Sequence, residues 1–245
     1  MKLVDHQAKS PEENIALDEM LLLKAEAGKE GETLRVWESP EYFVVLGRGS
    51  KLSEDCFRDA CVRDRIKIIR RISGGGTILQ GPGCLNFSLI LSYSRETVYS
   101  KIRDSYEHIL SQISDEFAKE GCDTAVCPLS DIAFNGKKIS GNAQARKRSF
   151  FLHHGTILYD FDIKKISVYL KHPSSEPRYR EKRLHQEFLT NISVTSGTLE
   201  TLIKCVFLRK DQMLWHPAEK DIQELDRLTS VKYTEDKWNI EGSPA

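Results

Sequence analysis

The sequence has 245 residues, and its 36 lysines and arginines are balanced by 36 aspartates and glutamates, so no net charge directs the protein toward nucleic acid or an anionic membrane. Hydrophobic residues make up 40% of the chain, enough for a substantial core. No apolar signal segment stands at the amino terminus, and no run approaches the roughly 18 apolar residues of a membrane-spanning helix. We therefore expect a cytoplasmic protein with neither nucleic-acid nor membrane partners.

Six cysteines are spread over the chain, at positions 56, 61, 84, 122, 127 and 205. Without a secretory signal, a chain of this length is expected to keep its thiols reduced. The pairs Cys56/Cys61 and Cys122/Cys127 are at the loose end of zinc-ligand spacing. Because five helical positions would place Cys56 and Cys61 well apart around a helix axis, we expect core cysteines there and no metal site.

The amino-terminal third predicts helices and strands in alternation. Ser10, Pro11 and Glu13 are typical of a helix start, with a hydroxyl N-cap, a proline at the first position and a glutamate three residues after the cap. Apolar residues at helical spacing continue to Gly28, where the helix should end. Strands are expected at residues 33–37 and 42–46, and Ser53 is expected to cap a short helix that runs to about residue 64.

The central feature is the stretch 67–92, in which an apolar strand, two arginines, three glycines and a second apolar strand follow one another. We expect a hairpin whose loop contains the glycines at 74–76. Without Cβ atoms, glycines can bring backbone N–H groups close to a bulky or anionic ligand. Strand alternation should send either Arg70 or Arg71 toward the loop. A tight turn with surface arginines is the alternative, but such a turn needs fewer glycines, so a ligand-binding loop is preferred.

Together with the helices and strands expected after residue 92, the pattern predicts an α+β domain with mixed or antiparallel sheets packed with helices. A helix at 98–117 should end near Gly121. Asn135-Gly136 predicts a type I′ turn between strands at 131–134 and 137–145, and another strand is expected at 149–159. A short helix at 162–170 and helices at 199–208 and 218–228 complete the pattern. No P-loop and no dinucleotide-binding glycine motif is present.

Two short motifs in these strands contain groups that can act chemically. Lys137 and Lys138 point to opposite faces of a strand, so at most one of them faces a pocket, where its ammonium could hold a carboxylate against a phosphate. Gly141 would let a bulky ligand approach the backbone. An exposed hairpin tip explains the same residues. His153 and His154 also face opposite sides, and because no carboxylate is near in sequence, a core histidine is preferred over a catalytic triad.

Taken in order, these motifs resemble the lipoate-protein ligase family. The resemblance extends over about residues 10–160 and rests on NIALDEM at 14–20, LRVW at 34–37, VVLGR at 44–48, RRISGGGT at 70–77, Asp131, GKKISGNA at 136–143 and HGT at 154–156. Lys232-Tyr233 and Trp238 are similar to the end of that family's large domain. The family fold is that of lipoate and biotin ligases, and we expect one catalytic domain over residues 1–245, without a carboxy-terminal accessory domain.

The resemblance implies a two-step reaction. ATP first adenylates lipoate or octanoate, and the acyl group then passes to a lysine of a lipoyl carrier domain, in a 2-oxoacid dehydrogenase complex or the glycine cleavage protein. By position, Lys138 would be catalytic and Asp131 would hold Mg²⁺. The implied substrate and adenylate contacts are Arg71, Ser73, Gly74, Gly75, Gly76, Thr77, Ser140, Gly141, Ala143, His154 and Gly155. The enzyme would work without the accessory domain, or a second polypeptide would supply it.

Several alternatives stay open. Gln80 and Ser130 stand where many ligases have histidine and asparagine. A related branch of octanoyl- and lipoyltransferases needs no ATP and uses a cysteine, for which Cys127 is the candidate. A biotin ligase ranks third, because Gly47-Arg48-Gly49 only faintly resembles its arginine-rich glycine loop, and a non-catalytic binder of acyl adenylate is a different class. The basic residues Arg178, Arg180, Lys182 and Arg183 form either a solvated loop or the docking site of the carrier domain. The sequence leaves open the carrier protein, the preference between lipoate and octanoate, and the oligomeric state.

Overall fold

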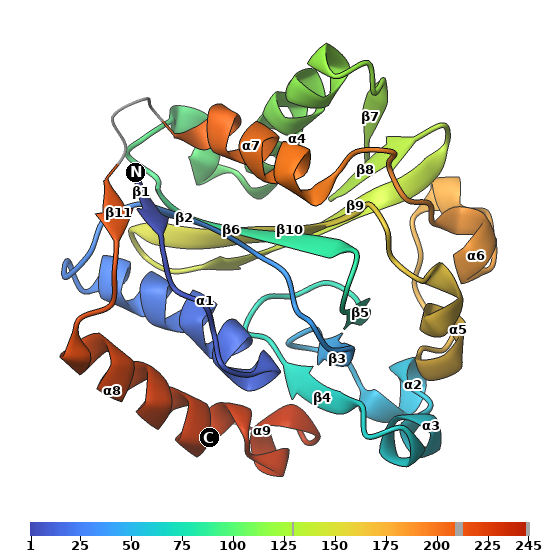
Figure 1. Ribbon diagram of the computed structural model, residues 1–245, viewed down its shortest axis with the longest axis horizontal. Helices are drawn as coiled ribbons and strands as arrows, with labels where there is room; N and C mark the ends of the chain where they lie inside the picture. Colours follow the sequence, from blue (N-terminus) through green and yellow to red (C-terminus); the bar gives the residue numbers. More distant parts are fainter. Residues whose placement is uncertain (129, 209–212, 244–245) are drawn as a thin grey trace.

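The structure, a computed structural model, describes residues 1–128, 130–208 and 213–243. It has the mixed α+β architecture predicted from the sequence, with helices packed on two sheets (Figure 1). The larger sheet has the strand order β11-β1-β2-β6-β10-β9-β8-β7, and the smaller one has the order β4-β3-β5. The strands are β1 Lys2–Val4, β2 Thr33–Trp37, β3 Phe43–Leu46, β4 Lys67–Arg70, β5 Ile78–Gln80, β6 Cys84–Ser92, β7 Thr124–Cys127, β8 Asp131–Phe134, β9 Lys137–Arg146, β10 Phe150–Leu158 and β11 Leu214–Trp215.

The helices surround the sheets. They are α1 Pro11–Glu26, α2 Leu52–Asp55, α3 Arg58–Arg63, α4 Ile102–Lys119, α5 Ile166–Tyr169, α6 His185–Phe188, α7 Ser196–Phe207, α8 Glu219–Leu228 and α9 Asp236–Asn239. Short 3₁₀ segments occupy Thr97–Ser100, Ile163–Lys165 and Arg178–Arg180, and a π-helical turn occupies Thr229–Tyr233. None of the helices in the described ranges is both long and apolar enough to span a membrane.

The two faces of the large sheet are covered by different helices. Helices α4 and α7 pack on one face, around Phe117, Leu199 and the fully buried Phe151 of β10. On the other face, α1 lies between the large sheet and the β3–β5 sheet, with α8 outside it (Figure 1). The strands β6 and β10 are antiparallel neighbours at the centre of the large sheet, and both are largely buried.

The start of α1 agrees with the prediction. Ser10 is the N-cap, and its hydroxyl accepts a hydrogen bond from the Glu13 N–H at 3.2 Å. The helix is buried nearly all round, including polar residues that the sequence pattern does not place inside. Asp18 pairs with Arg35, and Glu19 pairs with Lys232. The buried carboxylates of α1 are therefore paired with cations from β2 of the large sheet and from the turn after α8.

The predicted hairpin over residues 67–92 is wrong. Its two strands belong to different sheets, because β4 pairs in parallel with β3 and β6 lies in the large sheet. A short extra strand, β5, pairs antiparallel with the other side of β3. The glycine loop, defined here as residues 73–76, therefore connects the two strands that flank β3. The fully buried β3 can satisfy its backbone groups only by pairing on both sides, and this determines the path of the chain.

The helix predicted from Ser53 to residue 64 is also wrong, because it is divided into α2 and α3. The N-caps are Lys51 and Phe57, not Ser53. Cys56 between them is extended, 2% exposed, and forms a β-bridge with Leu170. In contrast, the Asn135-Gly136 turn is confirmed, since both residues have positive φ as a type I′ turn requires.

Candidate active site

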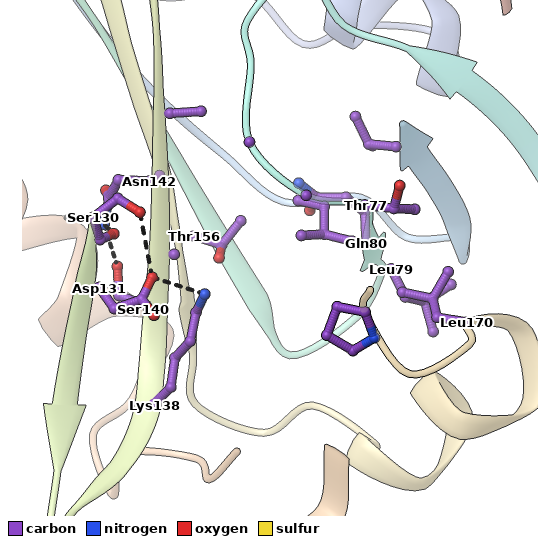
Figure 2. A pocket seen from close by; sticks show the side chains of 18 of the residues that line it. Thr77, Leu79, Gln80, Ser130, Asp131, Lys138, Ser140, Asn142, Thr156 and Leu170 are labelled. Carbon is purple, nitrogen blue, oxygen red and sulfur yellow. Dashed lines mark hydrogen bonds and ion pairs between the residues drawn. The ribbon is translucent and has the colours of Figure 1, made fainter. Parts of the chain in front are cut away.

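A cavity of about 660 Å³ opens between the β8–β9 hairpin, β10, the glycine loop and the segment that follows Leu170. Its size is typical of a small-molecule site. Figure 2 shows Asp131, Lys138, Ser140 and Asn142 on one side of it, across from Thr77, Leu79, Gln80 and Leu170. Further apolar lining residues are Ile15, Trp37, Val45, Ile78, Phe87 and Leu158. The cavity thus joins an apolar region to a polar, charged wall.

Most of the predicted site residues lie together at this cavity. Those that line it are Arg71, Gly75, Gly76, Thr77, Asp131, Lys138, Ser140, Gly141, Ala143, His154 and Gly155. Ser73 and Gly74 are not part of the lining, and Ser73, the first residue of the loop, is fully buried. Lys137 is exposed on the opposite face, so the prediction that only one of the two lysines faces a pocket is confirmed.

Arg71 organises the glycine loop from below. Its Nη2 donates hydrogen bonds to the carbonyls of Gly74 and Gly76 at 2.6 and 2.8 Å, and its Nε donates to Ser73 Oγ at 2.8 Å. The side chain is 5% exposed, and burial lowers the pKa of its guanidinium to about 10. Because it is still charged at neutral pH, Arg71 places a cation directly under the loop.

The glycine loop also depends on contact with the turn after β3. The Arg48 N–H donates to the Ser73 carbonyl at 2.8 Å. A Cβ on Gly47 would lie 2.0 Å from the Gly75 carbonyl oxygen, so only glycine fits there. Gly75 itself has a φ of +82°, a conformation that favours glycine. Two of the glycines in these motifs are therefore required by the path of the backbone.

Arg70 points the other way, as strand alternation predicts. Its guanidinium is 2% exposed and donates to the carbonyls of Gly47, Ser50, Trp238 and Ile240, at distances from 2.7 to 3.2 Å. Burial, together with the charge of Arg48, lowers its pKa. Arg70 thus joins the loop at residues 47–50, part of which lines the cavity, to the chain around α9.

On the opposite wall, Lys138 extends along β9 to Asp131 of β8. Its Nζ lies 2.8 Å from Asp131 Oδ1, and Oδ2 of the same carboxylate accepts a hydrogen bond from the Tyr179 hydroxyl at 2.6 Å. Burial and the charge of Asp131 raise the pKa of Tyr179, so this tyrosine is a neutral donor. No sequence motif pointed to Tyr179, because only the tertiary fold brings the 178–180 turn against β8.

Two glycines of this wall make room for side chains of the protein. A Cβ on Gly141 would lie 2.7 Å from Lys138 Nζ, and a Cβ on Gly155 would lie 1.9 Å from Asn142 Oδ1. Gly141 therefore lets Lys138 cross the strand toward Asp131. Gly141 also lines the cavity, so the interpretation in which it admits a bulky ligand stays a prediction.

The two histidines of β10 face opposite sides, as predicted. His153 is fully buried, stacks on Phe87, and has its pKa lowered by burial to about 3. His154 lines the cavity, with Nε2 2.6 Å from Ser73 Oγ and Nδ1 3.3 Å from Asp18 Oδ2. The carboxylate that the sequence did not place near His154 comes from α1.

The charges around the cavity are not fully paired. Of the lining cations, Lys51 pairs with Glu54, Lys138 pairs with Asp131, and Arg180 lies 3.3 Å from Glu176. Arg71 and Lys171 have no carboxylate within ion-pair distance in the described part of the chain, and Lys171 Nζ donates to a backbone carbonyl. A buried cation without a counterion favours an anionic ligand.

Cys127 is half-buried at the end of β7 and is not among the residues that line the cavity. Burial, and then the charge of Asp131, raise the pKa of its thiol, against the smaller opposite effect of Lys138. Cys84 does line the cavity, but burial raises its pKa strongly. Neither thiol has the lowered pKa of a reactive cysteine. Cys56 and Cys61 are buried in the core, as predicted.

The predicted magnesium site has limited support from the donor groups. Across residues 1–128, 130–208 and 213–243, no three His, Cys, Asp or Glu side chains are grouped as metal ligands. Asp131 is a single carboxylate: Oδ1 pairs with Lys138 and accepts a hydrogen bond from the Ser130 hydroxyl at 3.5 Å, whereas Oδ2 accepts one from Tyr179 and retains a free lone pair. Magnesium is commonly held by one carboxylate together with substrate phosphates and water. Asp131 therefore fits as one ligand of an ion brought in with a phosphate.

Comparison with known proteins agrees with the fold and the motifs. The family described as Lipoyl protein ligase A/B catalytic domain matches residues 10–206, so the chain belongs to this family. It is an enzyme of the lipoate ligase and octanoyltransferase family, and the resemblance predicted from the motifs is confirmed.

The relatives include both ligases and transferases. Probable lipoate-protein ligase A of Mycoplasma pneumoniae is 26% identical over 93% of this chain and 67% of its own length. Octanoyltransferase LipM of Oceanobacillus iheyensis is 28% identical over 92% of this chain and 85% of its own length. The bipartite lipoate protein ligase of Thermoplasma acidophilum has the same fold, with a TM-score of 0.84, 20% identity and coverage of 100% of this chain and 97% of its own. A lipoate-protein ligase A bound with ATP superposes with a TM-score of 0.81, 22% identity and 98% coverage of both chains.

Proposed function

We propose that the protein is an ATP-dependent lipoate-protein ligase that adenylates lipoate or octanoate and transfers the acyl group to a lysine of a lipoyl carrier domain. The observation that carries this proposal is the charge of the cavity. Arg71 and Lys171 have no carboxylate partner within the described residues, while Lys138 projects from the facing wall. A site that joins a carboxylate to a nucleoside triphosphate brings two anions together and needs such cations.

The first step would form an acyl adenylate. A carboxylate oxygen attacks the α-phosphorus of ATP, the new carboxylate oxygen–phosphorus bond forms, and pyrophosphate leaves with the electrons of the broken bond. Lys138 has three N–H donors, of which Asp131 takes one, so two are available for the reacting oxygens. Magnesium, when bound, would neutralise phosphate charge, and Asp131 is the residue that would hold it.

In the second step, the amine of the carrier lysine attacks the acyl carbonyl, and AMP leaves. The acyl chain would lie in the apolar part of the cavity, against Trp37, Val45 and Phe87. Burial there would leave the carboxyl end at the charged wall. The same cavity would accept lipoate and octanoate, because both present an apolar chain and one carboxylate.

Other proteins of the same fold support this proposal. One solved relative is a lipoate-protein ligase A bound with ATP, and another, from Thermoplasma acidophilum, is described with bound lipoic acid. The bipartite ligase of the same organism is described together with its E2 lipoyl domain, which supports lipoyl domains as partners.

The competing function is ATP-independent acyl transfer through Cys127, and it is kept because several relatives are octanoyltransferases. Measurement of ATP–pyrophosphate exchange on addition of lipoate, octanoate or biotin separates the candidates. A ligase gives exchange with lipoate or octanoate. A transferase, or a protein that only binds acyl adenylate, gives none.

A further inference from the structure

A continuous chain of hydrogen bonds links α1 to the glycine loop. Asp18 Oδ2 lies 3.3 Å from His154 Nδ1, His154 Nε2 lies 2.6 Å from Ser73 Oγ, and Arg71 Nε donates to the same Ser73 oxygen at 2.8 Å. We call these four residues the Asp18 relay. Asp18 is 3% exposed and Ser73 is fully buried. The relay therefore runs through the interior beneath the loop that faces the cavity.

The two ends of the relay set the direction of each hydrogen bond, because Arg71 can only donate and the Asp18 carboxylate can only accept. Ser73 Oγ accepts from Arg71, so the Ser73 hydroxyl proton is free to be donated to His154 Nε2. His154 then carries its proton on Nδ1 and donates it to Asp18. This assignment is consistent along the whole relay, and one tautomer of His154 satisfies every group in it.

Asp18 is held as a carboxylate at the far end of the relay. Burial alone would raise its pKa, but the hydrogen bond from His154 and the charge of Arg35, whose Nη1 lies 3.2 Å away, outweigh burial and lower the pKa. Ser88 Oγ donates to Oδ2 at 2.7 Å. An acceptor-only group therefore faces His154 Nδ1, and this fixes the tautomer.

Ser73, His154 and Asp18 have the order of a nucleophilic triad, but the environment of Ser73 rules out that role. The serine is 0% exposed, and its hydroxyl group is hydrogen-bonded to both Arg71 and His154. A nucleophilic hydroxyl must reach the substrate carbonyl. The relay reaches the glycine loop through Arg71, which holds the carbonyls of Gly74 and Gly76.

We propose that Asp18 is a positioning residue of the site: through His154 and Ser73 it fixes Arg71 and, with it, the conformation of the glycine loop. The inference rests on the proposed function for its kinetic effect but not for its geometry. Neither the loop motif nor the family resemblance assigns a role to Asp18, which lies 136 residues before His154 in the sequence.

The test compares Asp18→Asn and Ser73→Ala with Glu19→Gln. In Asp18→Asn, the amide oxygen should turn to Arg35, so the amide N–H₂ faces His154 Nδ1 and reverses the tautomer. His154 Nε2–H would then donate to Ser73, whose own proton would lose its acceptor. Glu19 is the matched control, because it is a buried carboxylate at the next position of α1 that binds Lys232 instead of the relay.

Two measurements decide the proposal. Nitrogen-15 NMR of histidine-labelled protein, with His154 assigned from a His154→Gln variant, should show Nδ1–H in the wild type and in Glu19→Gln, and Nε2–H in Asp18→Asn. In ATP–pyrophosphate exchange, Asp18→Asn and Ser73→Ala should each raise the KM for ATP roughly 10-fold, with a smaller change in kcat, because a hydrogen bond to a charged group is lost. The double variant should be no worse than the single ones, since both break one relay.

An Nε2–H tautomer in the wild type would overturn the proposal, as would an unchanged KM in Ser73→Ala, which keeps the Asp18–Arg35 pair and so tests the relay even where Asp18→Asn does not fold. If the wild type shows the Nδ1–H tautomer but no pyrophosphate exchange with any acid, the ligase function fails while the geometry of the relay stands. The two failures are thus distinguishable.

Discussion

Lys138 and Asp131 form an ion pair across the β8–β9 hairpin, with Nζ 2.8 Å from Oδ1. The lysine side chain is 25% exposed and the aspartate 7%, so the pair lies at the cavity wall with the ammonium toward solvent. Tyr179 holds the other carboxylate oxygen. Because Asp131 is fixed from both sides, it determines where the Lys138 ammonium sits, and a ligand anion would meet a cation that is already in place.

The first prediction concerns this ammonium. Lys138→Met keeps most of the stem but removes the charge, so adenylation should slow roughly 10²-fold to 10³-fold, as for the loss of one positioned oxyanion donor. Pyrophosphate exchange with lipoate is the measurement. Lys137→Met is the matched control, because Lys137 is exposed on the other face and should stay near the wild-type rate. Equal loss in both variants would contradict a specific role for Lys138.

The second prediction separates ligase from transferase. Cys127→Ser should be nearly silent, because the thiol lies outside the cavity lining and its pKa is raised. Wild type and variant are given lipoate with ATP and magnesium, and separately octanoyl carrier protein without ATP, and acceptor acylation is followed by intact mass. We expect modification only with ATP, in both proteins. Modification without ATP that disappears in Cys127→Ser, with a hydroxylamine-labile adduct on the wild type, would instead show the transferase.

The third prediction concerns the contact between Gly47 and the glycine loop. Gly47→Ala places a Cβ 2.0 Å from the Gly75 carbonyl oxygen, so the loop must move. The loss in the free energy of ATP binding should be at least as large as the loss in the free energy of unfolding. Gly31→Ala is the control, since a Cβ there meets nothing within 4 Å and Gly31 does not line the cavity. Calorimetric titration with ATP and urea unfolding of both variants provide the comparison. An unchanged ATP affinity in Gly47→Ala would refute the close-contact interpretation.

The fourth prediction is a pH dependence that arises from His153. Its pKa is lowered from 6.5 to about 3 in the folded protein, so between these values the unfolded state binds the proton and the folded state does not. The free energy of unfolding should therefore fall as pH drops below 6.5, by at most about 1.4 kcal/mol per pH unit from this group. His153→Gln should have a shallower loss between pH 6.5 and 5 in urea unfolding. Parallel curves for the two proteins would exclude this cause.

The sequence predicted the helices and strands themselves better than it predicted which strands pair with each other. Periodicity and capping located α1, α4 and the β8–β9 turn, because those signals are local. The pairing of β4 with β3 was missed, since nothing within residues 67–92 shows that β3 takes a strand on each side. Strand order depends on which buried edges remain unpaired in the whole fold, and a window of sequence does not contain that information.

The site shows the same division. The family resemblance carried by the motifs pointed to Arg71, Lys138 and His154, and all three line the cavity. Asp18 stands within the NIALDEM motif but was assigned no role, and Tyr179 lies outside all the motifs. Asp18 lies within a helix whose apolar spacing indicates only packing, and it reaches His154 because α1 is placed between the two sheets. Site residues that come together through tertiary contacts can be identified only from the three-dimensional structure.

The last prediction refines the docking of the carrier domain. The sequence offered four basic residues, but Arg180 is 6% exposed, pairs with Glu176 and stacks on Phe188, so it belongs to the structure of the loop. Arg178 and Lys182 are exposed beside the cavity rim formed by residues 173–177 and Arg180. A local basic patch acts mainly on the association rate of an acidic partner.

We therefore expect that replacing both Arg178 and Lys182 with serine slows acyl transfer to a lipoyl domain roughly 10-fold at low salt and reduces its salt dependence, while pyrophosphate exchange is unchanged. The control replaces Lys220 and Arg227 of α8, which are exposed and lie on the other side of the molecule from α6 (Figure 1). It removes the same charge at a distance and should leave transfer near the wild-type rate.

Stopped-flow or single-turnover measurements of acyl transfer at several salt concentrations give the association rate constant of the enzyme and the lipoyl domain. Equal slowing in the two double variants would mean that total charge, not this patch, guides the carrier, and equal loss of both half-reactions would mean that the patch supports the cavity itself.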